Sequence, residues 1–151
     1  MPAKSTSRKA AIDQLAHAAY QLSASDGRLR GRATRDPAAL SLTHARALKS
    51  LADFGPMTIG ALAERVATTS AAVTQLVSSL VKAGLVTRER ADGGDRRVAT
   101  VALTEAGRIR HIERQTHLEQ ALSELVADLD DAQVHTVSEV LRRLADLYDT
   151  L

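Results

Sequence analysis

Residues 69–84 read TSAAVTQLVSSLVKAG, and this stretch decides the fold that the sequence predicts. Thr69 is a typical N-cap residue, and the apolar residues after it recur at three- and four-residue steps, which indicates a helix with one buried stripe. Gly84 is well placed to end this helix in a left-handed conformation. The positions off the stripe are small or polar and uncharged as far as Lys82, whereas exposed helix faces usually carry charged residues. The buried stripe is expected to consist of Val73, Leu76, Val77 and Leu80.

Two more helices are predicted directly before this stretch. Thr43 is the expected cap of the first, and Gly55-Pro56 is its stop signal. Thr58 is the expected cap of the second, which is short. The core positions of the first would be Leu48, Leu51 and Phe54, and those of the second Ile59, Leu62, Ala63 and Val66.

The chain before residue 42 is expected to begin with an amphipathic helix. From about Lys9 to Ser25, apolar residues recur with helical spacing. Residues 26–37 hold two glycines, a proline and four arginines, a composition that favours a loop or a fraying helix end. The Arg/Gly-rich part, residues 27–35, could be a phosphate-binding loop or a disordered linker, and we favour the linker.

A β-hairpin and two helices are predicted after the stretch. Residues 85–91 and 98–103 contain β-branched residues with local alternation, and Asp92-Gly93-Gly94-Asp95 separates them. Thr104 is the expected cap of the next helix, and two helices with Leu and Val stripes then run to the end of the chain.

Two short helices joined by a tight turn and followed by a hairpin are the element order of a winged helix-turn-helix. In such a fold the second helix lies in the major groove of DNA, and its outer face presents polar side chains to base edges. Gln can pair with adenine, Ser and Thr with several base edges, and a free helix N-terminus suits a phosphate. The predicted recognition residues are Thr68, Thr69, Ser70, Ala71, Thr74, Gln75 and Ser78.

The hairpin carries the second set of predicted DNA contacts. An arginine at a glycine-rich tip can enter a narrow minor groove, where the negative potential is deepest. Two arginines spaced by two along one strand point to the same side and can reach phosphates. An acidic neighbour can hold a guanidinium in position. The predicted wing residues are Arg88, Arg90, Asp95, Arg96 and Arg97.

At these residues the sequence resembles the multiple antibiotic resistance regulator (MarR) family of bacteria and archaea. The resemblance is strong from about Leu42 to Gly107 and weaker in the flanking helices, and residues 27–35 do not match the family pattern. Each matching piece is short, and their order and spacing together are specific. The pieces are Leu42-Thr43 with Leu48 and Leu51, Leu62-Ala63, VTQLV at 73–77 with Leu80, GLV at 84–86, Asp92, DRR at 95–97 and LTEAG at 103–107.

The resemblance implies a mainly α fold with a small β-hairpin wing, a winged helix-turn-helix with N- and C-terminal dimerisation helices. The whole of 1–151 would be a single MarR-like domain, in which residues 9–40 and 105–151 dimerise and residues 42–104 form the DNA-binding lobe. The expected function is that of a transcription regulator, more commonly a repressor, which binds a pseudo-palindromic operator on double-stranded DNA as a homodimer. The apolar stripes of the C-terminal helices independently favour a two-fold partner, because a small lobe cannot cover them.

Members of this family often bind small aromatic acids or phenols and then release DNA. The residues that would lie in such a cleft here are His17, Tyr20 and His44. The five histidines lack metal-ligand spacing and the chain has no cysteine, so we expect no metal site, no cofactor and no thiol-based sensing.

Composition and charge agree with a soluble regulator. The net charge is +5 over residues 1–55, +2 over 56–104 and −5 over 105–151, which fits a chain that turns one end toward a polyanion. The first eight residues are polar and do not form a secretory signal, and no window reaches the roughly 18 apolar residues of a membrane span. A cytoplasmic protein is expected.

Two other function classes compete with a DNA-binding regulator. An enzyme would need a nucleophile with a base, or paired carboxylates in a glycine-lined cleft, and the sequence has no such signature, so we expect none. The second rival is a winged helix that binds protein without binding DNA. Such a module would tolerate acidic residues between Ser70 and Ser78, where this sequence has none.

Overall fold

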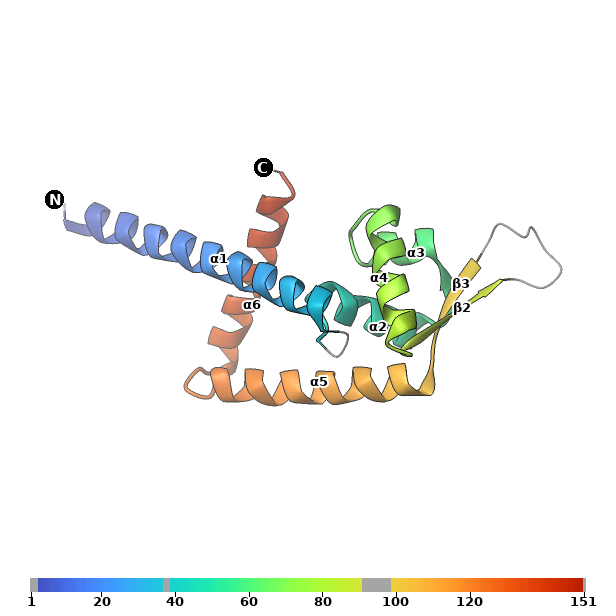
Figure 1. Cartoon of the computed structure of the whole chain (residues 1–151). Coiled ribbons are helices and arrows are strands. Elements are labelled where there is room, and N and C mark those ends of the chain that lie inside the picture. Colours follow the sequence, from blue (N-terminus) through green and yellow to red (C-terminus); the bar gives the residue numbers. More distant parts are fainter. Residues whose placement is uncertain (1–2, 37–38, 91–98, 151) are drawn as a thin grey trace. The chain divides into compact units, whose positions relative to one another are not determined.

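The computed structural model describes residues 3–36, 39–90 and 99–150, and for residues 3–6, 34 and 90 only the backbone. It is mainly helical with one small antiparallel sheet, as the sequence predicts (Figure 1). The chain divides into two compact units, Met1–His111 and Ile112–Leu151. The elements are α1 (Ala3–Arg35), α2 (Leu42–Phe54), β1 (Met57–Thr58), α3 (Ile59–Arg65), α4 (Ser70–Lys82), β2 (Val86–Arg90), β3 (Ala99–Leu103), α5 (Glu105–Leu125) and α6 (Asp131–Tyr148).

The sheet has the strand order β1-β3-β2, so β3 lies in the middle. Strands β2 and β3 form the predicted hairpin, in register from Val86 opposite Leu103 to Arg90 opposite Ala99. The predicted tip, Asp92-Gly93-Gly94-Asp95, lies outside the described residues. Strand β1 pairs with the other edge of β3 and was not predicted, because two residues are too few to show a periodicity.

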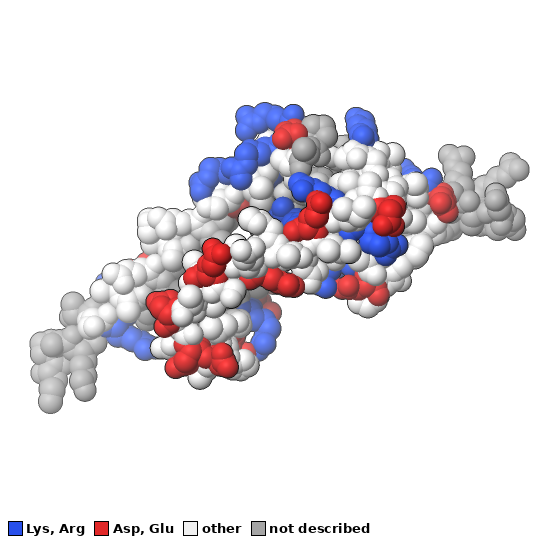
Figure 2. All heavy atoms as spheres, turned by 90° about the horizontal axis from the view of Figure 1, so that it is seen from below, with Lys and Arg blue, Asp and Glu red and all other residues white. Residues whose placement is uncertain are grey.

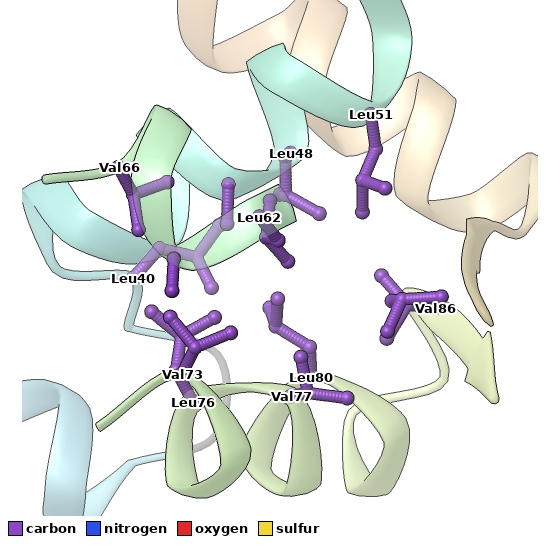
Figure 3. Close-up of a cluster of buried hydrophobic side chains, with 13 residues drawn as sticks. Leu40, Leu48, Leu51, Leu62, Val66, Val73, Leu76, Val77, Leu80 and Val86 are labelled. Atoms are coloured by element: carbon purple, nitrogen blue, oxygen red, sulfur yellow. The ribbon is translucent and has the colours of Figure 1, made fainter. Parts of the chain in front are cut away.

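The hydrophobic core of the first unit lies between α2, α3, α4 and the sheet. In Figure 3 the apolar side chains of α4 point toward Leu48 of α2 and Leu62 of α3. The predicted stripe of α4 is buried along its whole length, as are Leu62, Ala63 and Val66 around α3. Each such Leu or Val contributes about 1.5–3 kcal/mol when it is fully buried, so this core fixes which face of α4 remains outside.

Helix α2 differs from the prediction at both ends. Its cap is Ser41 and not Thr43: Ser41 Oγ accepts a hydrogen bond from the backbone N–H of His44 at 3.2 Å, and His44 Nδ1 accepts one from the N–H of Ser41 at 3.3 Å. Phe54, predicted to be in the core, is 61% exposed. The guanidinium of Arg65 lies 3.6 Å above its ring, and this cation–π contact explains how the ring is accommodated at the surface.

Helix α1 is continuous to Arg35, so the prediction of a loop, fraying end or linker over residues 26–35 is wrong. Glycine costs only about 1 kcal/mol relative to alanine inside a helix, and arginine is a good helix former. Asp26 and Arg30, one turn apart, add an ion pair at 3.2 Å. The composition that suggested a loop is therefore compatible with a helix whose last turn is basic. Residues 37–38 lie outside the described part.

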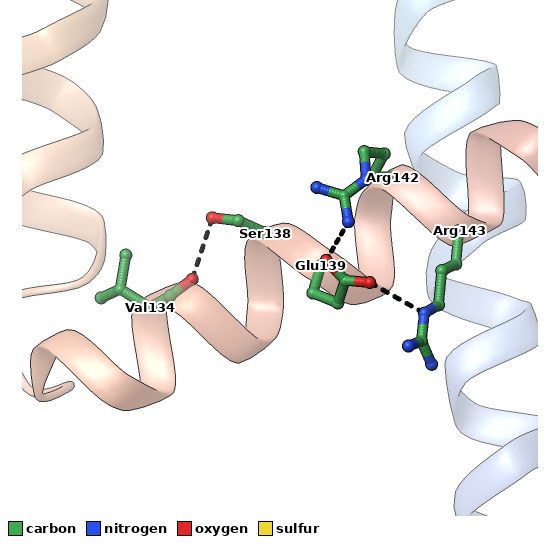
Figure 4. A network of polar contacts seen from close by, with 5 residues as sticks. All are labelled: Val134, Ser138, Glu139, Arg142 and Arg143. Atoms are coloured by element: carbon green, nitrogen blue, oxygen red, sulfur yellow. Dashed lines mark hydrogen bonds and ion pairs between the residues drawn. The ribbon is translucent and has the colours of Figure 1, made fainter.

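The second unit contains the part of α5 from Ile112 onward and the whole of α6. Asp130 begins α6 with a capping box: its side chain accepts from Gln133 N at 2.8 Å, and Gln133 Oε1 accepts from Asp130 N at 2.9 Å. On the helix surface, Glu139 pairs with Arg142 and, at 3.0 Å, with Arg143 (Figure 4). No described residue of α6 is buried within the single chain, so its apolar residues lack a cover.

Across residues 3–36, 39–90 and 99–150, no helix is long and apolar enough to span a membrane.

Candidate nucleic-acid interface

A tight turn joins α3 to α4. Helix α3 ends at Arg65 with Val66 as its cap, and Ala67 then adopts a positive φ of 52°. The N–H of Thr68 donates to the carbonyl of Ala63 at 3.1 Å, which closes the turn. Thr69 caps α4 as predicted, its hydroxyl accepting from the N–H of Ala72 at 3.2 Å.

The outer face of α4 carries the predicted recognition residues. Because the opposite stripe is buried in the core, these side chains point away from the protein. Thr68, in the turn, is half-buried. The residues exposed at the start and along the face are Thr69, Ser70, Ala71, Thr74, Gln75 and Ser78.

The hydroxyl groups on this face are oriented by the helix itself. Thr74 Oγ1 donates to the carbonyl of Ser70, and Ser78 Oγ donates to the carbonyl of Thr74, each at 2.9 Å. Both hydroxyls therefore present their lone pairs outward as acceptors. The Gln75 amide forms no hydrogen bond with any residue in the described part of the chain, so its donor and its acceptor both stay available.

The wing is described only in part. Arg88 lies on β2, is exposed, and faces Val101 across the strand pair. Arg90 ends β2, and its backbone pairs with Ala99. The other predicted wing residues, Asp95, Arg96 and Arg97, lie outside the described residues.

The end of α4 is tied to the start of α5. Gly84, at a φ of +72°, ends α4 in the predicted left-handed conformation. The hydroxyl of Thr104 donates to the carbonyl of Gly84 at 2.7 Å and accepts from the N–H of Gly107 at 3.0 Å. The sequence predicts Thr104 only as a helix cap and does not predict its hydrogen bond to Gly84. The signal for this junction is the LTEAG segment at 103–107, which contains both Thr104 and Gly107.

The three residues predicted to contact an effector are placed on two helices. His17 and Tyr20 are exposed on α1, where Nε2 of His17 lies 3.0 Å from the side-chain nitrogen of Gln21. His44 is half-buried in the first turn of α2, where it completes the capping box. The ring of His44 therefore already accepts a hydrogen bond that stabilises the start of α2.

Surface charge does not by itself mark the interface. Figure 2 shows one face of the molecule, on which acidic and basic side chains both occur. The shape and chemistry of α4, and not the surface charge, therefore indicate a nucleic-acid site.

A helix, a tight turn, a second helix with an outward polar face and a two-stranded wing define a winged helix-turn-helix protein. The model of the MarR family matches residues 40–97. YcgE of Bacillus subtilis (strain 168), described as an uncharacterized HTH-type transcriptional regulator, is 30% identical over 100 residues, which are 66% of this chain and 64% of that protein.

Solved structures of regulators share the fold. A probable transcriptional regulator from Pseudomonas aeruginosa is 26% identical with a TM-score of 0.69, over 88% of this chain and 98% of that one. The transcriptional regulator BldR from Sulfolobus solfataricus is 26% identical with a TM-score of 0.64, over 93% and 95% of the two chains. Over its winged helix-turn-helix segment, this chain is therefore similar to the MarR family. Its relatives are named as transcriptional regulators and not as enzymes, in agreement with the sequence-based expectation.

Proposed function

We propose that this protein regulates transcription by binding DNA sequence-specifically, with α4 in the major groove. The observation that carries the proposal is the outer face of α4, where exposed Ser, Thr, Gln and Ala side chains stand opposite a fully buried apolar stripe. No carboxylate lies between residues 69 and 84, so this face can approach phosphates without repulsion.

Within the groove each part of α4 has a distinct task. Gln75 can pair bidentately with an adenine, because both ends of its amide are available. Thr74 and Ser78, as acceptors, suit the amino groups of adenine or cytosine, and the methyl group of Ala71 can meet a thymine methyl. Thr68, Thr69 and Ser70, with the N-terminal N–H groups of α4, suit a backbone phosphate.

The wing supplies contacts beside the groove that α4 occupies. Arg88 is exposed on β2 and is assigned to a phosphate, together with Arg90. Arg96 and Arg97 are assigned to the adjacent minor groove, and Asp95 to holding a guanidinium in position. These contacts would add affinity for any sequence, whereas α4 would supply the discrimination.

The assembly that we propose is a homodimer on a pseudo-palindromic operator. Residues 42–104 would form the DNA-binding lobe, and residues 9–40 and 105–151 the dimer interface. Large apolar side chains on these flanking helices are exposed in the single chain, which favours a partner that covers them. They include Ile12, Leu15 and Leu22 of α1, Ile112, Leu118 and Leu122 of α5, and Val140, Leu141 and Leu147 of α6.

In the proposed cellular role, the dimer acts in the cytoplasm as a repressor that occupies an operator. A small aromatic or phenolic effector that releases the DNA is part of this proposal. Its predicted contacts are His17 and Tyr20, which are exposed on α1, and His44. Adding aromatic acids to preformed protein–DNA complexes tests it, since release that depends on His17 or Tyr20 is expected.

The experiment that tests DNA binding is a gel-shift titration with the duplex just upstream of the protein's own coding region. A shuffled duplex of equal length is the control. We expect tighter binding to the upstream duplex and a steep loss of affinity with salt. Absence of binding to either duplex at low ionic strength would refute the proposal and leave the protein-binding module as the alternative.

A further inference from the structure

The junction between α4 and α5 is built from backbone atoms and one hydroxyl. The hydroxyl of Thr104 bridges two helix ends. It donates to the carbonyl of Gly84, directly after α4, and accepts from the N–H of Gly107 in the first turn of α5. The N–H of Thr104 also donates to the carbonyl of Leu85 at 3.1 Å. Two of these three hydrogen bonds join residues about twenty positions apart in sequence, and the third, from Gly107 to Thr104, lies within the first turn of α5.

Gly107 brings the two backbones into direct contact. It is buried, and a Cβ atom at this position would lie 1.9 Å from the carbonyl oxygen of Leu85 and 2.9 Å from its carbonyl carbon. Both atoms belong to the backbone, so no side-chain rotation can relieve the clash. The first turn of α5 must move away from Leu85 if residue 107 is anything larger than glycine.

This geometry leaves little freedom between the two helices. A contact through long side chains can adapt by changing rotamers, whereas backbone-to-backbone contact transmits a displacement directly. Since Leu85 follows the left-handed residue that ends α4, a shift of the start of α5 moves the end of α4.

We infer that Thr104 and Gly107 are positioning residues that hold the end of α4 against the first turn of α5 and so set the orientation in which α4 meets DNA. This inference rests on the proposed function of α4. Neither residue touches DNA in this account, and their effect on DNA binding passes through α4. Loosening the junction would reduce the fraction of molecules in which α4 is oriented for binding, and the apparent dissociation constant rises in proportion.

The test compares Thr104→Val, which removes the hydroxyl at nearly constant shape, with Thr104→Ser, which keeps it. Gly107→Ala adds a methyl group that clashes with the backbone of Leu85. Each full-length variant is titrated with the upstream duplex and with a shuffled duplex, well below its melting temperature. Circular dichroism and thermal melting report on folding.

We expect Thr104→Val and Gly107→Ala to raise the dissociation constant for the upstream duplex by about tenfold or more. A tenfold rise corresponds to a fall of the binding-competent orientation to about one tenth of the population. Binding to the shuffled duplex, which depends on phosphate contacts, should change little. Thr104→Ser should bind like the parent protein.

Other outcomes overturn the inference in distinguishable ways. If the parent protein binds no duplex, the proposed function fails and the inference fails with it. If the parent binds but Thr104→Val and Gly107→Ala bind equally well and only melt at lower temperature, the junction is purely structural. If both variants fail to fold while Thr104→Ser folds, the junction serves folding and not positioning, which also contradicts the inference.

Discussion

At the scale of single residues, the outer face of α4 is chemically uneven. The hydroxyl protons of Thr74 and Ser78 are used by the helix backbone, whereas the amide of Gln75 has no partner in the described chain. A side chain that can donate and accept at the same time distinguishes base pairs better than one that only accepts. Gln75 should therefore carry more sequence discrimination than its neighbours.

Replacing Gln75 tests this assignment. Gln75→Ala should relax the preference at one base position by about 1–3 kcal/mol, because a bidentate pair with adenine is lost. Fluorescence anisotropy with a set of single-base operator variants measures the change, and Gln120→Ala on α5, which is also exposed, is the matched control. An equal loss of affinity for every operator variant would contradict the assignment.

Arg88 should behave differently, because it is assigned to a phosphate. Arg88→Ala is expected to weaken binding to all duplexes alike and to lower the salt slope by about one unit. Titrations at four or more salt concentrations measure the slope. Arg142→Ala, which removes an exposed arginine from α6, should leave it unchanged, and a loss of base preference in Arg88→Ala would refute the phosphate role.

At the scale of secondary-structure elements, the caps fix where the helices of the DNA-binding lobe begin. Thr58 and Thr69 cap α3 and α4 with side-chain hydrogen bonds of 3.2 Å each, and Ser41 caps α2 within a capping box. Since α2 and α3 pack against the buried stripe of α4, these starts help to determine which face of α4 is presented.

The capping role of Ser41 can be measured directly. Ser41→Ala should lower the free energy of unfolding by about 1 kcal/mol, because the first turn of α2 loses its acceptor. Thr43→Ala, inside the helix, should change it by less than about half as much. Urea denaturation at fixed protein concentration gives both values. A larger effect at Thr43 than at Ser41 would indicate that Thr43 is the cap and would contradict the role of Ser41.

The elements that decide the site were predictable because their signals are local. The stripe of α4, its cap at Thr69 and its left-handed end at Gly84 are all encoded within residues 69–84. Strand β1 depends on pairing with β3, and the exposed position of Phe54 depends on Arg65, which are contacts between segments apart in sequence. The length of α1 differs from the prediction because the helix-forming arginines between and after Gly27 and Gly31 outweigh the low helix propensity of glycine. The roles of individual side chains toward DNA stay predictions.

At the scale of the whole molecule, the exposed apolar stripes of α1, α5 and α6 need a cover. A homodimer would cover them and would place two copies of α4 on two half-sites of one operator. Affinity for the operator then depends on dimer formation, because a monomer could engage only one half-site.

A charge within the stripe of α6 should break the proposed dimer. Leu141→Glu buries a carboxylate against the partner, so we expect it to shift the protein toward monomer and to weaken operator binding. Light scattering coupled to size-exclusion chromatography measures the mass. Ser138→Glu, off the stripe on the same helix, should leave the mass unchanged, and a monomeric parent protein would contradict the homodimer.

The most direct measurement of the central claim is photocrosslinking from the outer face of α4 to DNA. A photoreactive side chain replaces Gln75 in one protein and Gln115, on α5, in another, and each is irradiated with the upstream duplex. If α4 reads the operator, adducts to bases within it are expected from position 75 and none from position 115. Adducts from position 115 alone, or equal yields with operator and shuffled duplexes, would show that α4 does not read the sequence.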